Sequence, residues 1–162
     1  MSALDAFAAA AHEYCAWAEG DSRGALDDAR SARTLLAELF RRAVDLPELE
    51  DCDVTAPEIP NDEYQKIDRR FGSLPFNFYS QCFNPLVVPA EEPVTADLAD
   101  DLADIWRDVK RGLHLFRAGD RAAAAWHWRF HFDVHWGHHA TAAMNALQAW
   151  FSAVVFSAVE AR

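Results

Sequence analysis

The sequence predicts an all-α fold, a helical bundle of four to five main helices with a long Pro-rich, aromatic-rich irregular segment between helices 2 and 3. All seven prolines lie between Pro47 and Pro93, and because proline is excluded from helix interiors, the chain divides into helical, irregular and helical parts. Apolar residues recur at helical spacing on both sides of the proline region. With 162 residues, 51% of them apolar, the chain suits a single helical domain over residues 1–162.

The first part, residues 1–46, is predicted to form a helical hairpin. Apolar residues at helical spacing indicate a first helix over about 2–19. A second helix is expected to begin after a cap at Asp21 or Ser22 and to end at about Asp45. The short connection between the two predicts an antiparallel arrangement.

The middle part, residues 47–94, is predicted to be an irregular cover over the bundle. A short helix is expected over 62–71 with Asn61 as its cap. The stretch 74–83 carries four aromatic residues and is expected to run extended across the helices. A structureless loop of this length is unusual in a compact domain, so the aromatic residues favour a packed segment over a linker.

The last part, residues 95–160, is predicted to form a helical hairpin or kinked helices. The third main helix is expected after a cap at Thr95, and Asp120 is expected to cap the next one. Over 120–160 both one kinked helix and two consecutive helices fit the apolar pattern. A break or kink near Gly137 is favoured, because about 40 residues of straight helix would overrun a domain of this size.

Composition limits the classes of partner. The formal charge of −11 would repel nucleic acid and anionic membrane surfaces, so neither is expected as a partner. The longest strongly apolar stretch, Ala149 to Val159, is shorter than a bilayer span. The amino terminus lacks the pattern of a signal peptide, and the three cysteines show no C-x-x-C spacing. We therefore expect a cytoplasmic protein, monomeric or homodimeric.

A histidine stripe is the strongest chemical signal. His131, His135 and His139 step by four residues, so on a helix they lie close enough to hold one metal ion together. Neutral imidazole suits zinc, nickel or iron. His12 or His114 could supply a further ligand. The favoured interpretation is nevertheless that the histidines only pack against neighbours and that the protein holds no cofactor, and a divalent transition metal is the alternative.

An aspartate stripe on the third main helix is the second candidate. Three aspartates share one helix face and could pair with His135, His139 or Arg129 from the neighbouring helix: Asp101, Asp104 and Asp108. Beside a metal such carboxylates would orient the imidazoles. Without one they would form a solvated face, and Arg129 would form a structural pair with one of them.

No motif for a known reaction is present. The sequence contains no Gly-rich phosphate loop, no nucleophile elbow and no zinc-protease motif. The leading hypothesis is therefore a non-enzymatic protein that binds a partner or acts as an adaptor. The rival hypothesis is a metal-binding helical bundle, possibly a metal-dependent enzyme, that uses the histidines of 131–139.

Two segments carry a resemblance to a known family. One is LADDLADIWRDVKRGL at 98–113 and the other is WHWRFHFDVHWGHHA at 126–140. Together with Tyr14-Cys15 and the Phe-Asn-Pro of 83–85, they resemble a bacterial family known as domain of unknown function 5063, over nearly the whole chain. The resemblance implies an all-helical cytoplasmic protein and supplies no catalytic residues.

A shorter similarity points to metal binding. The pattern of His131, His135, His138 and His139 is similar to the last-helix motif of the DinB-type metal-binding helical bundles. In those proteins two histidines four apart join a third histidine from another helix, and His135 and His139 match that pair. This chain departs from the motif at 140–142, where Ala-Thr-Ala replaces the usual Arg-Gly-Gln, and its second helix has no histidine.

Overall fold

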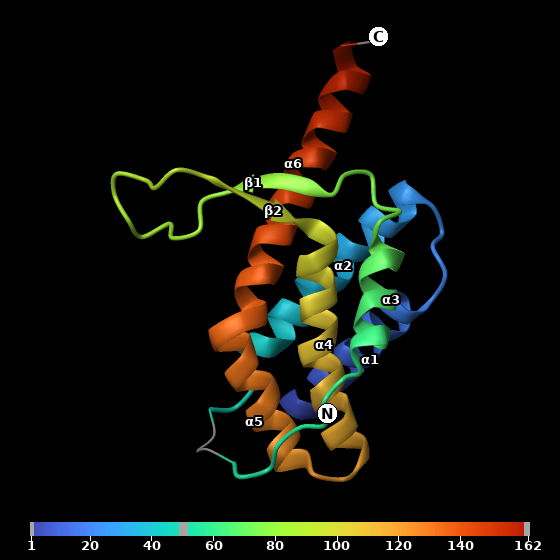
Figure 1. Ribbon diagram of the computed structural model, residues 1–162, viewed down its shortest axis with the longest axis vertical. Helices are drawn as coiled ribbons and strands as arrows, with labels where there is room; N and C mark the ends of the chain where they lie inside the picture. The colour runs from blue at the N-terminus through green and yellow to red at the C-terminus, as the bar shows by residue number, and fades with distance from the viewer. Residues whose placement is uncertain (1, 49–51, 161–162) are drawn as a thin grey trace.

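Helices dominate the fold, as the sequence predicts, and the prediction of an all-α bundle is confirmed apart from one small sheet. The computed structural model describes residues 2–48 and 52–160 (Figure 1). Residues 49–51, within the segment expected to be irregular, lie outside the described residues. The elements in chain order are α1 (Ala3–Glu19), α2 (Ala25–Val44), α3 (Asn61–Phe71), β1 (Phe78–Gln81), β2 (Val94–Asp97), α4 (Leu98–Arg117), α5 (Arg121–His131), the π-helical turn η1 (Phe132–Trp136) and α6 (Gly137–Glu160).

The first two helices form the expected hairpin, although α2 begins later than predicted. The hydroxyl of Ser2 caps α1 by accepting a backbone N–H of the first turn at 3.1 Å. Neither Asp21 nor Ser22 caps α2, whose first turn follows Gly24 at a φ of 100°. Ser22 instead donates a hydrogen bond of 2.6 Å to Asp28, a buried carboxylate of α2.

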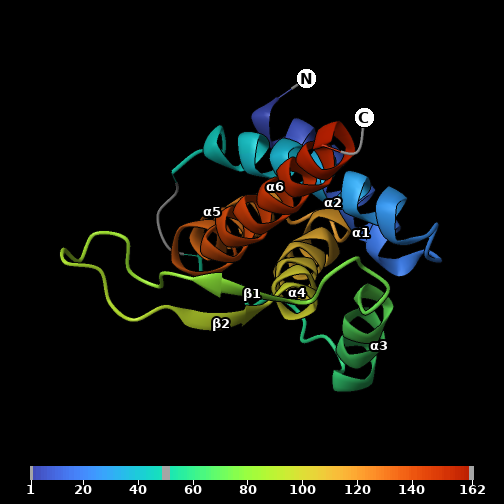
Figure 2. The same cartoon turned by 90° about the horizontal axis from the view of Figure 1, so that it is seen from above.

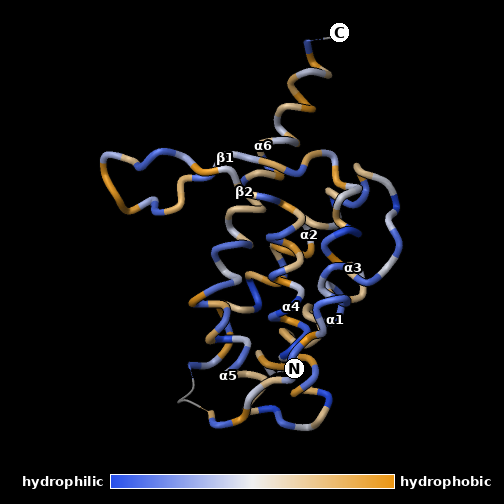
Figure 3. The backbone as a smooth tube through the Cα atoms, in the orientation of Figure 1, coloured by the Kyte–Doolittle hydropathy of each residue, from blue (hydrophilic) through white to orange (hydrophobic). Residues whose placement is uncertain are grey.

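The middle segment contains a two-stranded antiparallel sheet that the sequence did not predict. Strand β1 pairs with β2, with Phe78 opposite Asp97. The loop between the strands extends away from the helices, so only part of this segment covers the bundle (Figure 1). Apolar residues occur at the tip of this hairpin, where the tube is orange in Figure 3. The side chains of Phe83, Leu86 and Val88 in this loop are exposed.

Strand β2 leads directly into α4. Asp97 caps that helix by accepting from the backbone N–H of Ala99 at 2.9 Å, and Thr95, the predicted cap, lies within β2 instead. Likewise Asn61 is the first residue of α3 and not its cap, a position that Pro60 takes.

The last 40 described residues form one continuous helix, Arg121–Glu160, with the π turn η1 in its middle. The expected break near Gly137 is therefore a local change of helix type. A Cβ atom on Gly137 would lie 2.4 Å from the carbonyl oxygen of Phe132, so the residue after this turn must be glycine. The helix projects past the rest of the bundle at its carboxyl end (Figure 1).

This helix is long and apolar enough to cross a membrane, judged by length and composition alone. The uninterrupted apolar stretch from Ala149 to Val159 is shorter than this helix and did not predict it. In the structure 22% of its most apolar 18-residue window is buried. Its last turns expose Val155, Phe156 and Val159.

The core is centred on α4, which packs against α1, α3, α5 and α6 (Figure 2). Tyr14 of α1 is buried and donates a hydrogen bond of 2.8 Å to the carbonyl of Leu102. Trp128 of α5 is buried against Gly112 of α4, where a Cβ atom would lie 2.1 Å from the indole nitrogen. The same nitrogen donates to the carbonyl of Val109 at 2.9 Å. These contacts fix the helix α5–η1–α6 along one side of α4.

Candidate metal site

The aspartate stripe of α4 meets the histidine stripe of the long helix. The two stripes run antiparallel, so that His135 faces Asp108 and His139 faces Asp101. In both pairs the Nδ1 atom of the imidazole lies 2.7 Å from a carboxylate oxygen. Both carboxylates are buried, which makes the two contacts fixed parts of the packing.

Asp104 lies between these pairs and faces both histidines. Its Oδ2 atom lies 3.8 Å from Nε2 of His135 and 3.6 Å from Nε2 of His139. One ligand atom from each of the three residues lies within 4.8 Å of the other two. Each histidine thus bonds a supporting carboxylate through Nδ1 and turns Nε2 toward a shared point.

Two of the three separations are close to those of a zinc site. Ligand atoms about 2.0–2.1 Å from one tetrahedral ion lie roughly 3.3 Å apart. The two pairs of Asp104 with the histidines, at 3.6 and 3.8 Å, need to close by only a few tenths of an ångström. Small rotations of partly exposed side chains can supply this movement.

The third candidate ligand is supported as well. The Oδ1 atom of Asp104 accepts a hydrogen bond of 2.9 Å from the hydroxyl of Tyr64 and pairs with Arg107 at 2.7 Å. Burial, then the charge of Asp104, raises the pKa of Tyr64, so the phenol stays a neutral donor. Tyr79 of β1 donates to Asp101 in the same way. The middle segment therefore braces two of the three aspartates.

Electrostatics at the site follow from these contacts. Burial alone would raise the pKa of Asp108, but hydrogen bonds from His131 and His135 outweigh it and lower the pKa. The hydrogen bond to Asp101 is the main cause of the raised pKa of His139. The site thus gathers carboxylates that favour a cation.

The π turn explains why the histidines share one side of the helix. An α-helix turns by about 100° per residue, so eight residues would leave His139 roughly 80° from His131 around the axis. A π turn takes about one additional residue, which reduces this difference to roughly 20°. All three histidines at 131, 135 and 139 therefore lie against α4.

The structure separates some of the predicted ligands from this cluster. His131 lies 3.6 Å from Asp108 and contacts the ring of His127 in a tilted arrangement, outside the group formed by Asp104, His135 and His139. His12 and His114 are exposed, and neither belongs to the metal-sized group found among the described residues. The residue that joins the two histidines is thus an aspartate of the predicted polar network.

Arg129 also lies apart from the site. Its guanidinium bonds Asp133 at 2.8 Å and the carbonyl of Leu46 at 3.1 Å. The predicted pairing of Arg129 with an aspartate of α4 is wrong, because the side chain points toward the end of α2 instead.

Tyr64, Tyr79 and Arg107 were not identified from the sequence. The aromatic content of the middle segment was the available signal, but it gave no indication of which α4 carboxylate each phenol would reach. That information depends on the docking of α3 and β1 on α4.

A cleft of about 580 Å³ opens beside the cluster. Its walls come from α3 and the residues just before it, from α4 and from the long helix. They include the ligand candidate His135 together with His131, Tyr64, Arg107 and Arg111. A ligand in this cleft would therefore lie next to His135, the one of the three grouped side chains that lines it.

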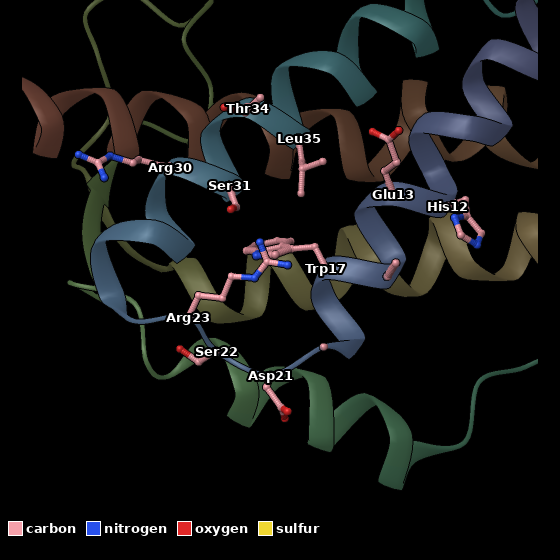
Figure 4. Close-up of a pocket in the computed structure, with 12 residues that line it drawn as sticks. His12, Glu13, Trp17, Asp21, Ser22, Arg23, Arg30, Ser31, Thr34 and Leu35 are labelled. Carbon is pink, nitrogen blue, oxygen red and sulfur yellow. The ribbon is translucent and has the colours of Figure 1, made fainter.

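A second cleft, of about 780 Å³, lies between α1 and α2 (Figure 4). His12 and Glu13 line it from α1, and Ser31 and Leu35 line it from α2. His12 therefore belongs to a different surface from the Asp104 cluster.

Comparisons with known proteins identify a family and one structure of similar fold. A family model described as domain of unknown function DUF5063 matches residues 2–152. The crystal structure of protein BF1032 from Bacteroides fragilis, a structural genomics target, is similar with a TM-score of 0.75 and 22% identity, over 90% of each chain. No curated protein sequence matches the chain.

Proposed function

Since the chain belongs to the family described as domain of unknown function DUF5063, we propose its function from the site itself: it binds a divalent transition metal through Asp104, His135 and His139. Zinc is the first candidate, and nickel and iron(II) are the others. The proposal follows the metal-binding alternative of the sequence analysis, with Asp104 in place of His131.

One observation carries this proposal. His135 and His139 each bond a different buried aspartate through Nδ1 and turn Nε2 toward the same oxygen of Asp104. In metalloproteins a ligating imidazole usually donates its other nitrogen to a carboxylate or carbonyl, which fixes the ring and increases its basicity. Histidines that serve only packing have no need for two parallel arrangements of this kind.

The donor set favours a site with open positions. Two imidazole nitrogens and one carboxylate oxygen are the protein ligands of many catalytic zinc sites and of non-haem iron(II) sites. Three protein ligands leave at least one position for water or another small ligand. The cleft beside His135 is the place from which such a ligand would enter.

Metal binding is tested by calorimetry and elemental analysis. We expect EDTA-treated, tag-free protein to bind about one equivalent of Zn²⁺ at pH 7.5. His139→Gln should weaken binding by at least 100-fold, because a ligand is lost. Asp101→Asn should weaken it by about 10–100-fold, the usual effect of losing the carboxylate behind a ligating histidine.

The adjacent, exposed His138 provides the matched control. His138→Gln removes the same chemical group one residue away and should leave zinc affinity unchanged. Less than about a tenth of an equivalent in the unsubstituted protein, or equal losses in the two glutamine variants, would show that the site does not bind metal.

A partner-binding role, the leading hypothesis of the sequence analysis, is the second candidate. It is supported by the hairpin tip, where Phe83, Leu86 and Val88 are 76%, 90% and 89% exposed. Exposed apolar clusters of this kind are typical of protein interaction sites. We expect a stoichiometric partner to co-purify with the protein and to be lost when all three residues are replaced by serine. Co-purification that is unaffected by the serines would refute a role for the hairpin tip.

A further inference from the structure

We propose that the cleft beside the metal site binds a small oxyanion, a carboxylate or a phosphate, held by Arg111 and Arg107 and bonded through one oxygen to the metal. This inference rests on the proposed metal site and goes beyond it by assigning the class of ligand. It is supported by the presence of two guanidinium groups, of Arg107 and Arg111, in the same cleft as His135.

The cleft has the size and composition of a small-molecule site. Its volume of about 580 Å³ accommodates a compact metabolite. Its polar lining includes the donors of the two arginines of α4, the amide of Asn61 and the imidazole of His131. Its two carboxylates, Glu58 and Asp108, are already paired with Arg111 and His135. Val134 and Ile59 supply apolar surface for the rest of a ligand. Such a lining suits an acceptor-rich group.

Arg111 is held in place before any ligand arrives. Its side chain is 16% exposed, and it donates to the backbone carbonyls of Ala56 and Pro57 at 3.2 and 3.1 Å. Glu58 is its charged partner at 2.8 Å, but that carboxylate is 82% exposed and therefore strongly screened by water. An anion bound deeper in the cleft would compete with a weak partner for a preorganised guanidinium.

Arg107 lies one helical turn earlier on the same face of α4. Its guanidinium lies over the ring of Tyr64, 4.8 Å from the centroid, and pairs with Oδ1 of Asp104. A metal ion bound to Oδ2 of Asp104 would partly neutralise the same carboxylate. The charge of Arg107 would then be less compensated by Asp104, and its remaining N–H donors would favour an anion.

The arrangement also distinguishes this cleft from the surface in general. The chain has a formal charge of −11, which disfavours anions over most of the molecule. Here two arginines four residues apart accompany a candidate metal ligand. Arginine next to an open metal position is suited to carboxylate and phosphate groups, since its planar fork matches two oxygens at once.

The inference is tested with the cobalt(II)-loaded protein, whose visible absorption reports ligands that bond the metal. Inorganic phosphate and succinate serve as probes, with titration calorimetry as the second readout. We expect at least one of them to change the spectrum and to bind the loaded protein at least ten times more tightly than the metal-free protein. The stronger probe identifies phosphate or carboxylate as the natural group.

The arginine variants separate cleft binding from binding to the metal alone. Arg111→Met should weaken the preferred anion by at least tenfold and leave cobalt content unchanged. Arg121→Met, which removes a partly exposed arginine of α5 paired with Asp5, is the matched control and should have no effect.

The outcomes distinguish the two proposals. Stoichiometric metal with no response to either anion overturns this inference and leaves the metal site standing. Anion binding that is equal in the Arg111 and Arg121 variants overturns the role of the cleft. Failure to take up any metal overturns the proposed function and this inference together.

Discussion

His127 should make the stability of the metal-free protein depend on pH between neutrality and about pH 4. The imidazole is buried beneath the site, with Nε2 3.1 Å from the carbonyl oxygen of Asp108. Burial is the main cause that lowers its pKa to about 4, and the neighbouring His131 adds to the shift. Arg111 lowers the pKa further, whereas the contacts with Asp108 oppose the shift.

The sign and size of the effect follow from linkage. The unfolded chain binds a proton at His127 near pH 6.5, whereas the folded protein resists it until about pH 4. The folded state therefore loses stability as pH falls through this window. Between pH 7 and pH 5 the loss attributable to this one group is about 2 kcal/mol, with a total of roughly 3 kcal/mol by pH 4.

The substitution His127→Gln isolates this contribution. The glutamine amide keeps a donor near the position of Nε2 but cannot be protonated. We expect urea unfolding, followed by tryptophan fluorescence in EDTA, to show that this variant loses about 2 kcal/mol less than the unsubstituted protein between pH 7 and pH 5. His138→Gln, at an exposed position, should lose as much as the unsubstituted protein. Equal pH dependence in both glutamine variants would refute the reasoning.

Three further predictions concern the packing that positions the site. Asp28→Ala should lower the free energy of unfolding by about 3–5 kcal/mol in the same assay, because Arg70 loses its buried partner. Arg70 bonds both carboxylate oxygens of Asp28 at 3.0 Å. A loss below about 1 kcal/mol would contradict this prediction. Gly112→Ala should destabilise by at least about 1–3 kcal/mol, because the added methyl group would overlap the buried indole of Trp128, and a near-neutral result would show that α4 and α5 are not so closely packed. Gly137→Ala should reduce stability, measured by unfolding, and zinc affinity, measured by calorimetry, because the new Cβ atom would collide with a backbone carbonyl of the π turn. Unchanged zinc affinity would show that the π turn does not position the metal ligands.

Much of the helical architecture could be predicted from local patterns. Proline placement and apolar periodicity located both helical parts, since these depend on residues close together in the sequence. The π turn could not be predicted from these local patterns. The apolar residues keep nearly the same helix face across 126–155, and at Gly137 this pattern fits a kink or a break equally well. Only the collision with the carbonyl of Phe132 shows why glycine follows a wide turn.

The strands and the bracing tyrosines could not be predicted for a different reason. Strand β1 is four residues long and pairs with a segment that the sequence assigned to the start of a helix. Asp97 caps α4 in preference to Thr95, which the pairing draws into β2. Both outcomes depend on contacts between distant segments, which local propensity does not contain.

The site was predicted as a region more accurately than as a set of ligands. The meeting of His135 with the aspartates of α4 follows from two amphipathic stripes on neighbouring helices. These stripes do not predict that Asp104, and not His131, joins the two histidines, because that depends on how one helix is rotated against the other. Arg129 was misplaced for the same reason, since its side of the helix faces α2.

The two tyrosine braces have a consequence for the order in which the molecule assembles. Tyr64 and Tyr79 come from a segment that packs on the bundle from outside, whereas the groups they hold belong to α4. A folding intermediate with its helices paired but this segment undocked would therefore have unbraced carboxylates and a weaker site. By reciprocity, an ion that prefers the braced arrangement would slow the release of the segment, and hydrogen exchange in α3 and β1 would slow with it. Metal binding would then be detectable as slower hydrogen exchange in α3 and β1, although none of the proposed metal ligands lies in these elements.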